Sequence, residues 1–226
     1  MVSREEQCNH LCSSVLSLQF LLSITLLTFS QFALAEDLTE ETTEASYETA
    51  IKVVERLHTN LLKMMQATDT ITFVERYSTL EPVITESFDT PVIVKVILSR
   101  YWKDLTDQQK EDFIHLFNQL TIATYVSRFN SFDGEVFITK TVEQLRKGRI
   151  LVRSEIQSQN GDSVNLDYLM HKNNGNWNII SVIADGVNDL SLKRVEYSTI
   201  IKKNGYENLV TNIEKKIAEM ENKKAK

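Results

Sequence analysis

The spacing of apolar residues divides the chain into two halves. No glycine precedes Gly134, and up to that point apolar side chains recur mostly at helical intervals. The clearest helix is predicted over residues 47–65, where His58 shares the apolar stripe and is interpreted as a core residue rather than a ligand. Residues 106–109 spell a T-x-x-Q capping box, which begins a long amphipathic helix expected to end near Phe129. The first half is therefore predicted to be helical.

Two segments of this half carry mixed signals. Residues 70–88 favour a second helix, which we expect to be interrupted near Pro82 because proline cannot donate a backbone hydrogen bond. Thr90 and Pro91 have the pattern of an N-cap followed by the first helical residue. The residues that follow, 92–98, have high β propensity and no clean period, so local rules leave both a helix and a strand open there.

The second half has the pattern of an antiparallel sheet. Its expected strands are separated by four turn signals, which are Asp133-Gly134, Lys147-Gly148, Asn160-Gly161 and Asn174-Gly175. Apolar and polar residues alternate in the second and third of these strands, and one face carries Ile150, Val152, Ile156, Val164, Leu166, Tyr168 and Met170. Such a sheet has one buried face, which the helices of the first half can cover. The predicted fold class is therefore α+β.

The end of the chain is predicted to contain one more strand and two helices. Residues 177–184 are apolar on both parities, which is typical of a strand that is central or covered on both sides. A helix is then expected over residues 192–203, with Gly205 just beyond its end. The last helix is expected over residues 206–220, where apolar residues again share one face.

The chain begins with a segment that we interpret as a cleaved signal peptide. Residues 13–35 contain no charged side chain and end in Ala33-Leu34-Ala35, which matches an A-x-A cleavage site. The alternative is an uncleaved membrane anchor, since about 20 apolar residues can span a bilayer. Both cysteines, Cys8 and Cys12, lie within residues 1–35, so cleavage would leave a chain without cysteine. Such a chain suits an oxidising compartment.

The rest of the chain is expected to form a single domain with short flanks. Residues 36–46 are an acidic, flexible leader, residues 47–220 are the domain, and residues 221–226 are a basic tail. A content of 42% hydrophobic and 25% charged residues is typical of a folded globular protein. The formal net charge of -6 argues against nucleic acid as a partner, because an acidic surface repels phosphate backbones.

No residue pattern points to catalysis or to a cofactor. The sequence has no P-loop, no G-x-S-x-G elbow and no G-x-G-x-x-G fingerprint. The histidines beyond the predicted signal peptide, His58, His115 and His171, are too widely spaced for a zinc site. By strand parity Asp167 points away from the apolar face, and Asp185 belongs to an expected turn. We therefore expect no enzyme, no metal and no cofactor.

Ten phenylalanines, seven tyrosines and two tryptophans are enough either to fill a large core or to line a cavity. Composition alone favours a large core. Several short segments, however, carry a resemblance that implies a cavity. They are Tyr101-Trp102-Lys103, residues 106–109 with Phe113 and Phe117, Asn176-Trp177, residues 183–187, Tyr197 and residues 204–209. Together they resemble the MlaC (toluene-tolerance) family of periplasmic lipid carriers. The likeness covers roughly residues 45–220, is weaker before Pro91, and does not extend to the acidic leader.

This resemblance implies an NTF2-like or MlaC-like fold, in which a curved antiparallel sheet packs against several helices around a hydrophobic cavity. It also implies a periplasmic carrier that shuttles phospholipid and so maintains outer-membrane lipid asymmetry. The implied partners are an outer-membrane lipoprotein–porin complex and the inner-membrane MCE-domain ring protein of an ABC transporter. We expect a monomer. Two alternatives remain, a carrier of another hydrophobe such as a hopanoid or a solvent-tolerance-related lipid, and an enzyme that uses the same cavity fold.

Strand parity and helix faces predict which residues would bind the lipid. We expect the cavity to be lined by Val92, Val96, Phe113, Phe117, Ile150, Val152, Leu166, Tyr168, Met170 and Val187. No cluster of arginines precedes an apolar stretch, so we expect the head group to be recognised loosely.

Overall fold

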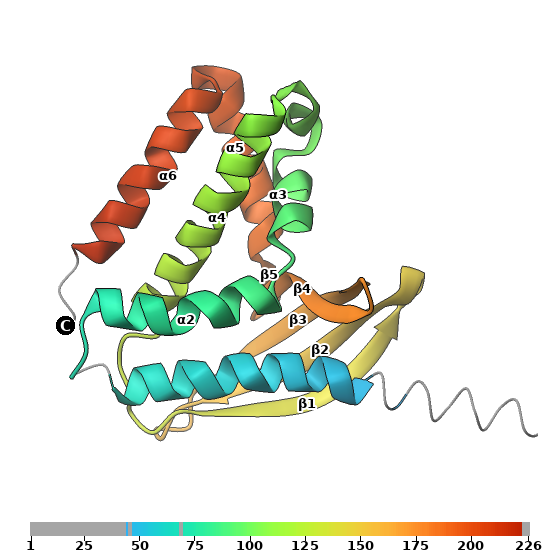
Figure 1. Cartoon of the computed structure of the whole chain (residues 1–226). Coiled ribbons are helices and arrows are strands. Elements are labelled where there is room, and N and C mark those ends of the chain that lie inside the picture. The colour runs from blue at the N-terminus through green and yellow to red at the C-terminus, as the bar shows by residue number, and fades with distance from the viewer. Residues whose placement is uncertain (1–43, 45–46, 68–69, 223–226) are drawn as a thin grey trace, which may run out of the picture. The chain divides into compact units, whose positions relative to one another are not determined.

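The computed structural model describes residues 44, 47–67 and 70–222, which Figure 1 shows as a ribbon. The predicted signal peptide, nearly all of the acidic leader and the last four residues of the basic tail lie outside the described residues. The chain divides into two compact units, residues 1–48 and residues 49–226, and the second contains the sheet and its helices. Among the described residues, no helix is both long enough and apolar enough to pass through a membrane.

Helices form most of the chain before the sheet, as the apolar spacing predicts. Residues 49–66 are helical. They are followed by α2 (Phe73–Ser87), α3 (Thr90–Leu98), the 3-10 helix η1 (Ser99–Asp104) and α4 (Asp107–Arg128). After the sheet come α5 (Asp189–Asn204) and α6 (Tyr206–Glu221). The capping box predicted for α4 is confirmed, because the Thr106 and Gln109 side chains each bond the other residue's backbone N–H.

Helix α2 corrects the expectation of a break at Pro82, because it runs through this proline from Phe73 to Ser87. Proline leaves the carbonyl of Ser78 without its helical donor. Both Ser78 and Pro82 are exposed, so water can reach that carbonyl. On the opposite face Leu80 and Ile84 are fully buried, and their packing holds the helix together across the missing bond.

Helix α3 settles the segment that local rules leave open. Its N-cap is Asp89, one residue earlier than predicted, and the Asp89 carboxylate accepts a hydrogen bond from the backbone N–H of Val92. The other carboxylate oxygen lies 2.8 Å from both His171 Nε2 and Asn173 Nδ2 on the sheet. This tertiary anchoring of the cap outweighs the β propensity of the residues that follow.

The sheet has five antiparallel strands in the order β1-β2-β3-β4-β5. They are β1 (Val136–Leu145), β2 (Arg149–Gln157), β3 (Ser163–Asn173), β4 (Asn176–Ala184) and β5 (Val187–Asn188), with the short 3-10 turn η2 (Arg146–Gly148) between β1 and β2. The turn between β3 and β4 confirms the Asn-Gly signal, because Asn174 and Gly175 have φ angles of 50° and 84°. A two-residue hairpin turn of this kind needs positive φ at both positions.

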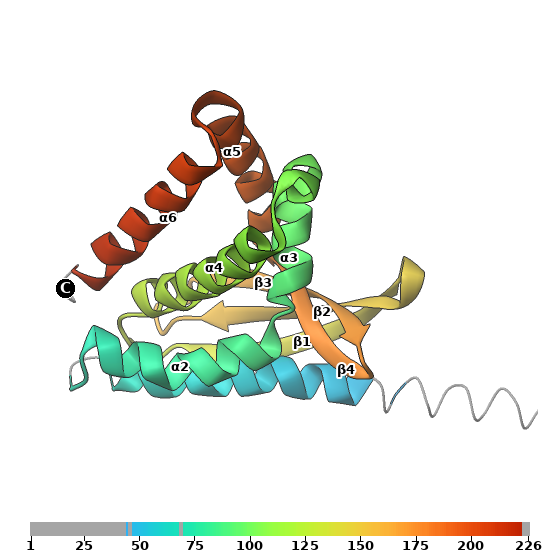
Figure 2. The same ribbon diagram turned by 45° about the horizontal axis from the view of Figure 1, so that its top comes forward.

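One face of the sheet is covered by helices and is apolar, as predicted. In β3 the side chains of Leu166, Tyr168 and Met170 are buried, whereas the residues between them are at least partly exposed. Figures 1 and 2 show the helix over residues 49–66 and α2 side by side next to the sheet. Strand β2 departs from strict alternation, because Leu151 on the outer parity is only 8% exposed.

The outer face of the sheet carries charges that pair across the strands. Arg153 on β2 bonds Glu143 on β1 at 2.9 Å and Asp167 on β3 at 2.8 Å. The register of β1 against β2 shifts between Thr139 and Thr141, which leaves Lys140 as an extra residue at a bulge. Charged side chains of this kind are typical of a face exposed to water.

Candidate functional site

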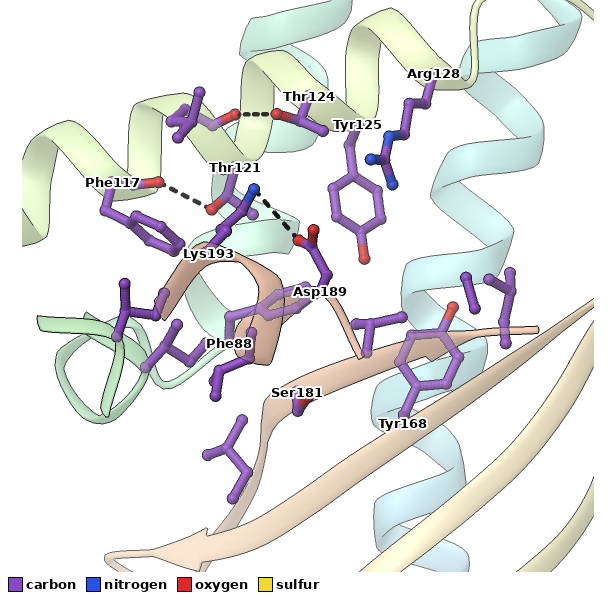
Figure 3. A pocket seen from close by; sticks show the side chains of 18 of the residues that line it. Phe88, Phe117, Thr121, Thr124, Tyr125, Arg128, Tyr168, Ser181, Asp189 and Lys193 are labelled. Atoms are coloured by element: carbon purple, nitrogen blue, oxygen red, sulfur yellow. Dashed lines mark hydrogen bonds and ion pairs between the residues drawn. The ribbon is translucent and has the colours of Figure 1, made fainter. Parts of the chain in front are cut away.

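A cavity lies between the sheet and helices α3, α4 and α5, and Figure 3 shows most of its lining side chains. Its empty space is about 910 Å³, a volume that includes open space at the mouth. The lining residues are Phe88, Ile93, Ile97, Phe117, Leu120, Thr121, Thr124, Tyr125, Arg128, Phe129, Leu166, Tyr168, Ile180, Ser181, Val182, Ala184, Asp189, Leu190 and Lys193.

Helix α4 supplies one continuous wall. Its lining residues are spaced by three or four positions from Phe117 through Thr121 and Thr124 to Arg128, so they share one face of the helix. The hydroxyl of Thr121 donates to the carbonyl of Phe117 at 2.8 Å, and that of Thr124 donates to the carbonyl of Leu120 at 2.7 Å. Because these hydroxyls are satisfied within the helix, the two threonines add little polarity to the wall.

Strand β4 supplies another wall, which depends on a bulge. Met170 of β3 pairs with Ile179 and Leu169 pairs with Ser181, so Ile180 has no partner on β3. Because the bulge breaks the alternation of side chains, the consecutive residues Ile180, Ser181 and Val182 all line the cavity. The Ser181 hydroxyl lies 3.2 Å from the amide oxygen of Asn188 and is therefore satisfied.

A row of six rings, which we call the aromatic wall, includes four that line the cavity and continues to His58 on the helix over residues 49–66. Its successive ring centroids are 4.3 to 6.1 Å apart. In order, the rings belong to Phe88, Tyr125, Phe129, Phe137, His58 and Tyr168. Spacings in this range are typical of favourable aromatic pairs. Four elements contribute to the wall, so its rings hold one another in place.

The last two rings of the aromatic wall are joined by a buried hydrogen bond. His58 Nε2 lies 2.9 Å from the Tyr168 hydroxyl, and the two residues are 4% and 1% exposed. Burial lowers the pKa of His58 from 6.5 to about 4 and raises the pKa of Tyr168 well above 10.0. Both groups are therefore neutral at pH 7, so this end of the cavity carries no charge.

The charged groups of the cavity lie toward its open end. Arg128 is exposed, and the Asp189 side chain is 47% exposed. Lys193 Nζ lies 3.4 Å from Asp189, whereas no carboxylate of the described residues lies within ion-pair distance of Arg128. Burial raises the pKa of the neighbouring Tyr125, an effect that Arg128 opposes and Asp189 adds to. With two cations and one carboxylate, the mouth has one positive charge in excess.

Comparison with known proteins decides the family. The model of the family described as MlaC protein matches residues 55–215, which is more than half of the chain. This chain belongs to the MlaC family. A solved structure with a similar fold is the phospholipid-binding protein from Ralstonia solanacearum, determined in complex with a phospholipid. The two chains are 19% identical with a TM-score of 0.66, over 76% of this chain and 97% of the other. The predicted MlaC-like fold, a curved sheet packed against helices, is thereby confirmed.

The residues that strand parity and helix faces predicted to line the cavity fall into three groups. Phe117, Leu166 and Tyr168 line the cavity. Ile150, Val152 and Met170 are 0 to 2% exposed and lie on the same face of the sheet, but they do not line this cavity. The remaining four lie elsewhere, and these are Phe113, Val92, Val96 and Val187.

Each of the remaining four has a physical reason for its position. Phe113 is fully buried between helices, with its ring centroid 6.4 Å from that of Tyr197 and 5.9 Å from that of Tyr206. Val92 and Val96 lie on α3, where Ile93 and Ile97 occupy the face toward the cavity and leave Val96 40% exposed.

Val187 begins the two-residue strand β5 at the edge of the sheet, where it is 53% exposed.

The sequence pattern gave no signal for the other lining residues, with one exception. The helical face of α4 that includes Phe117 continues to Leu120, Thr124 and Arg128, so it could have been extended by spacing alone. The bulge that turns Ile180 into the cavity and the packing of Phe88 against Tyr125 are tertiary features. No local pattern encodes them.

The two carboxylates considered for catalysis lie outside the cavity. Asp167 pairs with Arg153 on the outer face of the sheet. Asp185 lies in a turn with a φ of 47°, and its carboxylate accepts a hydrogen bond from the backbone N–H of Asn165 at 2.8 Å. In the part of the chain that the structure describes, no three His, Cys, Asp or Glu side chains are grouped to hold a metal ion.

Proposed function

We propose that this chain binds a phospholipid in the cavity and carries it through the periplasm. The observation that carries this proposal is a mostly apolar cavity with a few charged side chains in its lining. Among the lining residues, Leu120 and Tyr168 are each 1% exposed, and Tyr168 is uncharged at neutral pH. The open end of the cavity carries Arg128, Asp189 and Lys193. This distribution matches an amphiphile whose acyl chains lie inside and whose phosphate lies at the mouth.

The size of the cavity supports this proposal. A methylene group takes up about as much room as a water molecule, roughly 30 Å³. The empty space of about 910 Å³ includes open space at the mouth, so an acyl chain bound there can extend out of the cavity toward the head group. At about 0.8 kcal/mol per methylene, exposing two chains with about 30 methylenes to water costs on the order of 24 kcal/mol. An enclosed apolar cavity removes this barrier without any chemical step.

The charges at the mouth support loose recognition of the head group. Arg128 has no carboxylate partner among the described residues and can attract the single negative charge of a phosphodiester. The carboxylate of Asp189 and the ammonium of Lys193 lie nearby, so either sign of charge on the rest of the head group meets a partner. Because these side chains are partly open to water, each contact is worth little.

The cellular part of the proposal rests on membership of the MlaC family. We propose that a signal peptide over residues 1–35 is removed on export, and that the domain exchanges lipid with two membrane complexes. These are an outer-membrane lipoprotein–porin complex and the MCE-domain ring protein of an inner-membrane ABC transporter. Repeated exchange would maintain the lipid asymmetry of the outer membrane. The chain acts as a monomeric carrier and not as an enzyme.

Lipid analysis of the purified protein tests the binding step. The full chain is expressed in a Gram-negative host, purified from the periplasmic fraction without detergent, and examined by native mass spectrometry and lipid extraction. We expect one phospholipid per chain and an N-terminus at Glu36. A chain that carries no lipid contradicts the proposal, and a neutral hydrophobe such as a hopanoid in place of phospholipid supports the alternative carrier.

Genetic complementation tests the cellular role. A strain that lacks the gene is expected to become sensitive to detergent, and the full-length gene is expected to restore resistance. A version without residues 1–35 is the matched control, because it keeps the domain and cannot be exported. Equal resistance with and without that segment would contradict a periplasmic role.

A further inference from the structure

The register of the sheet places Tyr168 between the part of the sheet face that lines the cavity and the part that does not. On one side it pairs with Val182 of β4, which lines the cavity. On the other side it pairs with Val152 of β2, which is fully buried and does not line the cavity. The Tyr168 ring is therefore the last side chain of this sheet row that an acyl chain in the cavity would meet.

The Tyr168 ring is held firmly in this place. Its hydroxyl is hydrogen-bonded to His58 Nε2 at 2.9 Å, and the His58 ring is stacked on Phe137 with an interplanar angle of 15°. Phe137 in turn contacts Phe129 on the segment after α4, with ring centroids 6.1 Å apart. A side chain fixed at its ring and at its hydroxyl cannot change rotamer without breaking a buried hydrogen bond, so it resists displacement by a flexible ligand.

We infer that Tyr168, pinned by His58, is the end stop of the cavity and determines the length of the acyl chain that this protein accepts. The inference rests on the proposed function and goes beyond it by assigning chain-length selection to one residue. The ring of Tyr168 limits how far an acyl chain can enter along this row of the sheet, because the next position, Val152, does not line the cavity. The position of the inner wall therefore decides which chains fit. His58 acts through Tyr168 as a positioning residue.

A competition experiment tests this assignment. Delipidated full-length protein is offered an equimolar mixture of saturated phosphatidylglycerols from dilauroyl to diarachidoyl, and the bound species are counted by native mass spectrometry. Tyr168→Ala removes the ring and is expected to shift the preferred acyl chain upward by about two to four carbons, since the surroundings relax only partly into the new space. Tyr168→Phe keeps the ring but loses the bond to His58 that pins it, so it is expected to shift the preference upward by less than Tyr168→Ala does.

A second variant changes the cavity from the opposite side. Val182→Phe adds a ring next to Tyr168 in open space, so it is expected to fold and to shift the preference toward shorter chains. If Tyr168→Ala fails to fold, Val182→Phe alone tests whether this wall determines the acyl-chain length. Unchanged chain preference in either variant overturns the inference, and so does a shift in Tyr168→Phe as large as that in Tyr168→Ala. A wild-type protein that retains no lipid at all overturns the proposed function together with this inference.

Discussion

Tyr168 separates two apolar regions of the covered sheet face that differ in whether side chains fill them. Toward β2, Ile150 and Val152 are 2% and 0% exposed and do not line the cavity, and we call this side the filled region. Toward β4, Val182 and Ala184 are partly exposed and face the cavity. The residue types are alike, so the difference lies in packing. The filled region stabilises the fold, and the unfilled region leaves apolar surface free for a ligand.

A carboxylate placed in each region should separate them most strongly. Val152→Asp buries an unpaired charge in the filled region and is expected to cost about 4 kcal/mol or more, enough to prevent folding of many domains. Val182→Asp places the same group in the cavity, where water can reach it, so we expect a folded protein that carries no lipid. Circular dichroism and native mass spectrometry measure the two results. If both variants unfold equally, the two regions do not differ as described.

Truncation of an aliphatic side chain should give the next largest difference. Leu61 is fully buried in the helix over residues 49–66. Leu61→Ala is therefore expected to lower the free energy of unfolding by about 2–4 kcal/mol. Leu190 lines the cavity and is partly exposed. Leu190→Ala is therefore expected to lower the free energy of unfolding by about 1 kcal/mol or less. Urea denaturation of the two variants gives both values, and equal losses would remove the distinction.

Low pH should reduce the stability of the protein through His58, which bonds Tyr168 at the border between the two regions. Burial lowers the pKa of His58 from 6.5 to about 4, so between these values the unfolded chain binds a proton that the folded chain does not. Its contribution to stability therefore falls as the pH drops through this window, by about 2 kcal/mol at about pH 5 relative to about pH 7. His58→Gln should lack this loss in urea denaturation at the two pH values. An equally steep pH dependence in both proteins would contradict the assignment.

The smallest effect is expected at the mouth of the cavity. Arg128→Gln removes the cation that faces the phosphate in our proposal and should weaken phospholipid binding by about fivefold, close to 1 kcal/mol, because the side chain is exposed. The same change at Arg149, an exposed residue of β2 that does not line the cavity, is the matched control and should leave binding unchanged. Lipid titration at low and high salt measures the effect, which should shrink as salt rises. A loss of folding stability without a loss of affinity would place Arg128 outside the binding site.

The sequence was sufficient for most of the fold because its signals are local. The Asn174-Gly175 turn, the alternation in β3 and the capping box of α4 each depend on a few neighbouring residues, and all three are present. The break expected at Pro82 was wrong, because exposure of the freed carbonyl and burial of the opposite face are tertiary properties. The start of α3 was misplaced by one residue for a similar reason, since its cap is anchored by His171.

The cavity was harder to predict than the sheet that carries it. Parity identified the covered face, and it correctly placed Leu166 and Tyr168 on it. Parity does not tell a filled part of that face from an unfilled one, so Val152 and Leu166 look equivalent in the sequence. The difference depends on where α4 and the bulge at Ile180 lie in space, and neither position follows from local spacing.

The bulge at Lys140 has a consequence for how molecules of this protein meet one another. Among the residues that the structure describes, β1 is the last strand on its side of the sheet, so no other described strand pairs with its outer row of backbone donors and acceptors. Such a row can recruit the same strand of another molecule and extend into a fibre. The extra residue, Lys140, interrupts the regular spacing of that row, which makes regular pairing with a second copy less favourable. The bulge is thus expected to disfavour self-association at this edge of the sheet.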